Sequence, residues 1–302
     1  MSSSINTNIA AMTALQSLNH TNKELLTTQN RISTGFRVND ASDNAAYWSI
    51  ATTMKSDRSA ISTVSDALGL GAATVDVAMQ GMEGAIEIAG KIKDKLVAAR
   101  QPGLDRVKIQ AEITQLQESL VSVVGTANFS GQNWLKTEAG DDTRELVASF
   151  SRDSAGAVGV GIITVDLVSS RLMDGDSGST GILDSTFDAG DGSVLTLDIS
   201  ELTDDATSLT ELNNLITGVD QAIIDMTAAG TSLGAIKSRI DLQKGFADSL
   251  MDAIDTGVGQ LVDADMNEES TRLQALQVRQ QLGVQALGMA NQGAQMILRL
   301  FQ

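Results

Sequence analysis

Apolar residues recur every three or four positions over most of this chain, which is the pattern of helices with one apolar face. The pattern predicts helices over about 5–32, 48–96, 109–127, 208–261 and 271–302. Gly35 interrupts the first run, and Pro102-Gly103 ends the second. Ser208-Leu209-Thr210-Glu211 fits a capping box that would begin the fourth helix. Pro102 is the one proline in 302 residues, so long uninterrupted helices are permitted.

The pattern changes after the third helix, at residues 128–131. From there, short runs of β-branched residues lie between Gly, Asp and Ser, which is typical of strands and hairpins. The runs predict strands over 145–150, 158–167 and 193–200. The predicted fold class is therefore mainly α with a small β insertion: a long antiparallel helical coiled-coil hairpin with the termini together and a central β-rich surface knob.

The two ends of the chain combine apolar stripes with very few charges. Residues 1–30 hold only Lys23 and Glu24 besides His20, and residues 271–302 hold three arginines. A helix on a solvated surface normally carries charged residues on the face opposite its apolar stripe, and these ends do not. We therefore expect other chains to cover the ends, and we expect the ends to be poorly ordered in a free monomer. The positions expected to form a polymerisation interface are Ile5, Ile9, Met12, Leu15, Leu18, Leu25, Ile32, Leu273, Leu276, Val284, Leu287, Leu298 and Phe301. A second stripe, on another face of the last helix, contains Val278, Leu282, Met289, Met296 and Leu300.

Charge is distributed unevenly along the chain. The net charge is −17, and residues 137–212 hold 16 acidic and three basic side chains, whereas residues 1–136 hold 12 of each. An acidic middle with neutral flanks argues against nucleic acid, whose backbone attracts Lys and Arg. The acidic segment is expected to face solvent.

Candidate catalytic chemistry is sparse. The chain has no cysteine and one histidine, His20, which excludes disulfides, thiolate metal sites and a His-rich metal cluster. The acidic residues Asp263, Asp265, Glu268 and Glu269 suit the first turn of a helix better than a cation site. A hydrolase that uses a pair of carboxylates of the middle segment is an alternative, but the sequence indicates no convincing pocket for it. We therefore expect no enzyme activity, cofactor or metal.

Membrane association is also not expected. The sequence has no run of 18 apolar residues and no cleavable signal peptide, so the protein would be cytoplasmic or exported by another route. Insertion of the amphipathic ends into a membrane is the alternative, but such helices usually carry a Lys/Arg-rich polar face.

Five segments carry distinctive motifs: SINTNIAAMTALQSLNHTN at 4–22, TQNRISTGFRVNDASDNAA at 28–46, IQAEITQLQESLVSVVGTANFSG at 109–131, SLGAIKSRIDLQ at 232–243 and LVDADMNEESTRLQALQVRQQLGVQALGMANQGAQMILRLF at 261–301. These segments resemble the bacterial flagellins. The resemblance covers about 1–136 and 213–302. The residues Tyr47-Trp48-Ser49 after DNAA are similar to the alphaproteobacterial, rhizobial type.

The resemblance implies a structural subunit that polymerises into the helical filament of the flagellum for swimming. A hook–filament junction protein, which shares both end signatures, is the alternative. The implied partners are further copies of the chain, sibling flagellins, the flagellar export apparatus with a chaperone, and the filament cap and junction proteins. The implied location is extracellular.

The resemblance also implies three domains. Residues 1–43 and 264–302 would form a coiled-coil inner tube, and residues 44–170 and 208–263 a helical outer tube with β-hairpins. Residues 171–207 would form a small acidic surface-exposed domain.

Overall fold

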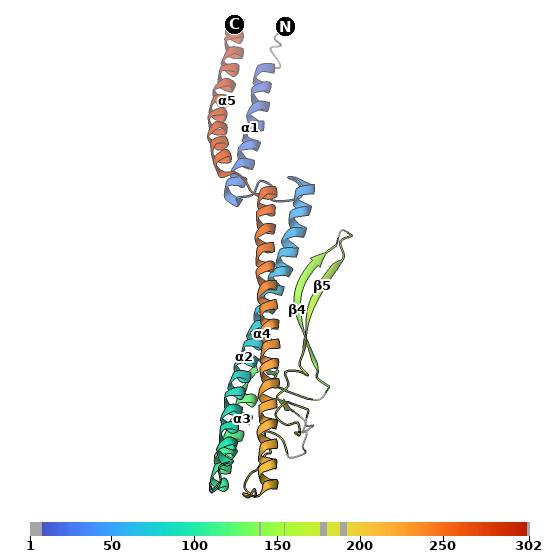
Figure 1. Cartoon of the computed structure of the whole chain (residues 1–302). Helices are drawn as coiled ribbons and strands as arrows, with labels where there is room; N and C mark the ends of the chain where they lie inside the picture. The colour runs from blue at the N-terminus through green and yellow to red at the C-terminus, as the bar shows by residue number, and fades with distance from the viewer. Residues whose placement is uncertain (1–7, 139, 154, 176–179, 188–191, 301–302) are drawn as a thin grey trace. The chain divides into compact units, whose positions relative to one another are not determined.

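The computed structural model of the protein describes residues 8–138, 140–153, 155–175, 180–187 and 192–300, with side chains up to Gly293. These residues form five helices, which confirms all five predicted helices and the mainly helical fold class with its small β insertion. The helices are α1 (Ile9–Thr34), α2 (Ala45–Ala99), α3 (Arg106–Thr126), α4 (Ala206–Val262) and α5 (Met266–Leu300) (Figure 1).

Each helix begins at an Asn or Asp side chain that accepts hydrogen bonds from the backbone N–H groups of the first turn. The capping residues are Asn8, Asn44, Asp105, Asp205 and Asp265. The predicted capping box at Ser208 is therefore wrong, because the N–H of Ser208 donates to Asp205 at 2.8 Å and α4 begins two residues earlier. Gly35 ends α1 with a positive φ of 76°, a conformation that glycine adopts without steric cost.

One long hairpin dominates the β structure. β4 (Thr143–Arg152) and β5 (Val158–Asp166) pair antiparallel, with a bulge between Val147 and Ser149. The other strands have two residues each: β1 (Asn128–Phe129) pairs with β2 (Gln132–Asn133), and β3 (Lys136–Thr137) pairs with β6 (Met173–Asp174). The first two predicted strands are thus present.

The third predicted strand, 193–200, is wrong. Its residues form turns, in which the carbonyl of Ser193 accepts from the N–H groups of Thr196 and Leu197. The hydroxyl of Thr196 accepts from the N–H of Ser193, so local side-chain bonds replace a strand ladder. Three of its apolar residues, Val194, Leu197 and Ile199, are nevertheless fully buried, and Leu195 is half-buried.

The chain divides into two compact units. The terminal unit comprises residues 1–58 and 252–302, and the core unit comprises residues 59–251. In the core unit, α2, α3 and α4 enclose a continuous apolar core, and the ion pairs Lys93–Asp220 (3.0 Å) and Lys237–Asp76 (2.5 Å) join α2 to α4. Apolar residues between β5 and α4 belong to this same core: Leu167, Leu172, Leu183, Val194, Leu197 and Ile199.

Candidate polymerisation interface

Within the terminal unit, α1 and α5 lie side by side and run antiparallel (Figure 1). Buried and half-buried positions recur on both helices in steps of three and four, the spacing of a coiled-coil seam. On α1 the seam positions are Ala11, Ala14, Leu18, Thr21, Leu25, Thr28 and Ile32. On α5 they are Glu269, Leu273, Leu276, Gln280, Gly283, Leu287 and Ala290.

This seam contains many small and polar side chains for a coiled coil. Only six of its positions are large and apolar, and the others are Ala, Thr, Gly, Gln or Glu. Polar contacts cross it at both ends and near the middle: Asn8 Nδ2 donates to the carbonyl of Ala290 (3.0 Å), Gln280 Nε2 to Asn22 Oδ1 (2.8 Å) and Arg31 Nη1 to Glu269 Oε1 (3.0 Å). The pair therefore buries little apolar surface between its own helices.

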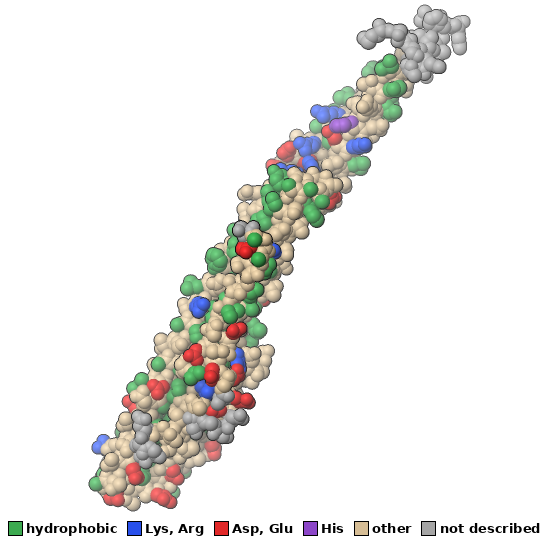
Figure 2. All heavy atoms as spheres, turned by 90° about the vertical axis from the view of Figure 1, so that its right-hand side faces the viewer, with side chains coloured by type: hydrophobic (Ala, Val, Ile, Leu, Met, Phe, Trp, Pro, Cys, Tyr) green, Lys and Arg blue, Asp and Glu red, His purple; other side chains and the backbone are tan. Residues whose placement is uncertain are grey.

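Large apolar side chains lie instead on the outside of the pair. Eight of them are 48–68% exposed, and we call these the outer stripes: Ile9, Met12, Leu15 and Leu26 on α1, and Val278, Leu282, Val284 and Met289 on α5. Figure 2 shows hydrophobic side chains open at the molecular surface. Large apolar side chains that are exposed together on a protein surface mark a candidate site of association with other proteins.

The positions expected from the sequence to form the interface divide into three groups. Six lie in the seam, against the chain's own partner helix: Leu18, Leu25, Ile32, Leu273, Leu276 and Leu287. Four are exposed: Ile9, Met12, Leu15 and Val284. Ile5, Phe301 and the side chain of Leu298 lie outside the described residues. Sequence reasoning missed Leu26, whose signal was its place eleven residues, or about three helical turns, after Leu15 on the same face of α1.

The remainder of the terminal unit has its own small core. Val38, Ala51, Val258 and Val262 are buried together, with Phe36 packed against them. The guanidinium of Arg37 donates to the carbonyl of Leu261 at 2.9 Å near the end of α4, where unpaired helix carbonyls favour a cation. Arg58 Nε also pairs with Asp255 at 2.6 Å. These contacts hold the ends of α2 and α4 that belong to this unit.

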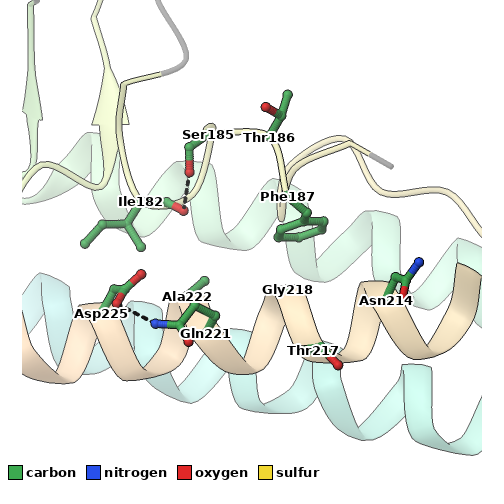
Figure 3. A pocket seen from close by; sticks show the side chains of 10 residues that line it. All are labelled: Ile182, Ser185, Thr186, Phe187, Asn214, Thr217, Gly218, Gln221, Ala222 and Asp225. Atoms are coloured by element: carbon green, nitrogen blue, oxygen red, sulfur yellow. Dashed lines mark hydrogen bonds between the residues drawn. The ribbon is translucent and has the colours of Figure 1, made fainter. Parts of the chain in front are cut away.

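The core unit has a hollow of about 380 Å³ beside α4, in which the ring of Phe187 lies over Gly218 (Figure 3). Gln221 Nε2 donates to Asp225 Oδ1 at 2.9 Å, so the carboxylate that lines the hollow already has a partner. Among the described residues that line it, none is basic, and the Ser and Thr hydroxyls have no neighbouring histidine to activate them. This hollow does not have the features of an active site.

Within the described residues, no group of three or more His, Cys, Asp or Glu side chains is placed to hold a metal ion. In the part of the chain that the structure describes, no helix contains an apolar stretch that could span a lipid bilayer. The acidic residues at the start of α5 have other contacts: Asp265 caps the helix, and Glu269 pairs with Arg31.

Comparison with protein families matches both ends of the chain. Residues 5–139 match the bacterial flagellin N-terminal helical region, and residues 216–301 match the bacterial flagellin C-terminal helical region. The residues between the two matches include most of the acidic segment 137–212.

Similar proteins extend over nearly the whole chain. It is 48% identical to flagellin C of Rhizobium meliloti strain 1021 over 318 residues, with 99% of each chain covered. It is 46% identical to a flagellin of Brucella melitensis over 300 residues, again with 99% of each covered. Among solved structures, a protein described as flagellar hook-associated, from Vibrio parahaemolyticus, has a TM-score of 0.54 at 17% identity and covers 73% of this chain and 100% of its own. That likeness concerns the fold alone.

Proposed function

Because the chain belongs to the bacterial flagellin family and is a structural subunit of the flagellar filament, not an enzyme, we propose that it polymerises through the outer stripes of α1 and α5. One observation carries the proposal: in this helix pair the large apolar side chains lie mostly outside, and the seam is small and polar. Burial of one such side chain contributes about 1.5–3 kcal/mol, so neighbouring copies that cover the stripes would stabilise both helices. We infer that the pair becomes ordered on assembly.

We propose three roles for the parts of the chain. Residues 1–43 and 264–302 form the inner tube, and residues 44–170 and 208–263 form the outer tube. Residues 171–207 form the acidic outer surface, which is held against the helices by buried side chains such as Leu172 and Leu183. The concentration of acidic side chains in 137–212 supports an outward position, because like charges are best tolerated in solvent.

Membership of the flagellin family supports proposals for the other binding partners of the chain. The chain self-assembles with other copies, and we propose that sibling flagellins can enter the same filament. We propose further that it is delivered by the flagellar export apparatus with a chaperone, contacts the cap and junction proteins at the filament ends, and functions outside the cell without binding nucleic acid or membrane. The hook–filament junction alternative is not favoured, because the relatives at 38–48% identity are flagellins.

A pair of matched substitutions tests the interface. Leu282→Asp places a carboxylate in an outer stripe at a residue that is 58% exposed, and Val107→Asp places the same charge at a residue of α3 that is 61% exposed. An unpaired carboxylate buried between copies costs more than the ~1.4 kcal/mol that corresponds to a tenfold change in affinity. We expect Leu282→Asp to raise the critical concentration for polymerisation at least about tenfold.

Val107→Asp is the control. Its critical concentration for polymerisation should lie within about twofold of that of the unsubstituted chain, since Val107 lies outside the stripes. Sedimentation and electron microscopy of seeded samples give the measurement, and circular dichroism shows whether each monomer is folded. Normal polymerisation of the Leu282→Asp chain would refute the proposal.

A further inference from the structure

The outer stripes of α1 and α5 contain one methionine each. Met12 of α1 is 61% exposed and Met289 of α5 is 68% exposed, and no other methionine in the described part of the chain is more than half exposed. In contrast, Met82 and Met226 are buried in the core unit, with exposures of 1% and 0%. The proposed interface therefore carries two accessible thioether groups.

The two methionines lie at nearly the same level of the helix pair. Asn8 Nδ2 donates to the carbonyl of Ala290 at 3.0 Å, which places these two residues side by side. Met12 lies four residues after Asn8, and Met289 lies one residue before Ala290. Because α1 and α5 run antiparallel, the levels of the two methionines differ by about 4.5 Å at 1.5 Å per residue, less than one helical turn. One short stretch of the pair thus presents both thioethers.

An exposed thioether reacts with peroxides. The chain has no cysteine, so its methionine sulfurs are the groups most open to oxidation. A sulfur lone pair attacks one oxygen of hydrogen peroxide, and the S–O bond forms as the O–O bond breaks. The sulfur gives up two electrons, and the second oxygen leaves as hydroxide, which takes the proton from the transferred oxygen and becomes water. The product, methionine sulfoxide, has a polar S=O group in place of an apolar sulfur.

The sulfoxide oxygen would have different neighbours at the two positions. Ile9 and Leu15 lie three residues before and after Met12 on the same face of α1, and both are apolar. A copy that covered this stripe would bury the S=O group among apolar side chains, which is unfavourable. Gln285 lies four residues before Met289, and its amide can donate to a sulfoxide oxygen. Oxidation of Met12 should therefore have the larger effect.

We propose that Met12 and Met289 are oxidation sites through which a peroxide controls assembly. Oxidation of the free chain hinders its addition to the polymer, whereas neighbouring copies in the polymer cover both sulfurs and keep them reduced. The inference rests on the proposed function, because it requires the outer stripes to be the interface. Methionine sulfoxide reductases reverse the step: the sulfoxide oxygen leaves as water while a dithiol is oxidised to a disulfide.

The first measurement is the rate of oxidation at each methionine. Peptide mass spectrometry of the full chain after brief treatment with hydrogen peroxide gives this rate. In dilute monomer, Met12 and Met289 should be oxidised at least about ten times faster than Met82 and Met226, because oxidation follows exposure. In the polymer, oxidation of Met12 and Met289 should be at least about tenfold slower than in the monomer.

The second measurement is the assembly of the oxidised chain. Oxidation of the unsubstituted monomer should raise its critical concentration for polymerisation at least about tenfold, while circular dichroism shows an unchanged helix content. Treatment with sulfoxide reductases specific for both epimers, together with dithiothreitol, should restore the original value. Met12→Leu with Met289→Leu conserves apolar volume, and after the same oxidation its critical concentration should lie within about twofold of that before oxidation.

Met266→Leu is the matched control. Met266 is 46% exposed at the start of α5 but lies outside the outer stripes, so the chain with this substitution should be as sensitive to peroxide as the unsubstituted chain. Of the two single substitutions in the stripes, Met12→Leu should preserve more assembly after oxidation than Met289→Leu.

The two measurements distinguish failure of this inference from failure of the proposed interface. If Met12 and Met289 are oxidised as fast in the polymer as in the monomer, copies do not cover the outer stripes, and both are overturned. If the polymer protects the two sulfurs but a chain with sulfoxide at both positions polymerises normally, only the inference is overturned. Loss of assembly in the oxidised Met12→Leu, Met289→Leu chain would also overturn the inference, because other methionines would then be responsible.

Discussion

The core unit and the α1–α5 pair are both built from helices, but they place their apolar side chains differently. Between the helices of the core unit, large side chains such as Leu68, Leu96 and Leu120 are completely buried. In the α1–α5 pair, six seam positions are large and apolar, while eight side chains of that kind are exposed on the outer stripes. The core unit thus buries a continuous apolar core within one chain, although side chains such as Leu242 and Phe246 are exposed. The terminal pair, in contrast, exposes more large apolar side chains than it places in its seam.

This difference separates the stability of the subunit from that of the polymer. A helix gains most of its stability from tertiary packing of its apolar face. We therefore expect the core unit to provide the cooperative unfolding transition of the monomer, and the terminal pair to contribute mainly after assembly.

The largest expected effect compares one leucine from each unit. Leu120→Ala in α3 creates a cavity in the core unit and should lower the free energy of unfolding of the monomer by about 2–5 kcal/mol. Leu276→Ala, at a residue that is only 3% exposed in the seam, should leave the monomer's main thermal transition unchanged and make the polymer dissociate more readily. Circular dichroism of dilute monomer measures the transition. Equal losses in the monomer's free energy of unfolding in the two variants would contradict the difference between the core unit and the terminal pair.

Two glycine substitutions in α2 test how tightly the core unit is packed. We expect them to change the monomer's stability by smaller amounts and in opposite directions. An added methyl group at Gly81 of α2 would lie 2.7 Å from Ala127 Cβ and 2.7 Å from Leu135 Cδ1, whereas the space around Gly90 is open to 4 Å. Gly81→Ala should destabilise the monomer by about 1–3 kcal/mol through overpacking. Gly90→Ala should stabilise it by about 0.5–1 kcal/mol through helix propensity.

Chemical denaturation of both glycine variants gives the two free energies. If Gly81→Ala also stabilised the monomer, the contacts between α2 and the segment that follows α3 would be looser than described. Comparable gains at the two positions would remove the contrast between a filled interior and an open helix surface.

The smallest expected effect concerns acid. The side-chain and backbone hydrogen bonds from Lys108 lower the pKa of Asp105 below its ordinary value, and the backbone and side-chain hydrogen bonds from Ser208 do the same for the pKa of Asp205. A carboxyl with a lowered folded-state pKa stabilises the fold above its unfolded pKa, and this contribution is lost as pH falls through the folded pKa. Acid should therefore weaken the first turns of α3 and α4, whereas α1 and α2 have uncharged Asn caps.

Amide hydrogen exchange, expressed as protection factors at each pH, measures this loss. Asp105→Asn and Asp205→Asn keep a capping side chain that does not titrate in this range, so these chains should show no acid-dependent loss at those turns. If they lose protection to the same extent as the unsubstituted chain, the caps are not responsible.

Most of the secondary structure could be predicted from the sequence. All five helices follow from apolar periodicity, which is a local property, and Pro102-Gly103 and Gly35 mark helix ends through their own backbone preferences. The family motifs at both ends are equally local. The segment 193–200 was not predictable in the same way, because its alternating residues suit a strand, while hydrogen bonds of Ser193 and Thr196 and burial against the helices produce turns.

The sequence by itself determined that the two ends are charge-poor helices with more apolar surface than one partner can cover. Only the tertiary structure decided which apolar residues face the chain's own second helix: Leu18 and Leu276 lie in the seam, whereas Met12 and Leu282 remain exposed. It also decided that Glu269, which suits a solvated first turn, is buried against Arg31. The physical reason is that periodicity defines stripes on one helix, but their contacts depend on the rotation and register of a second helix distant in sequence.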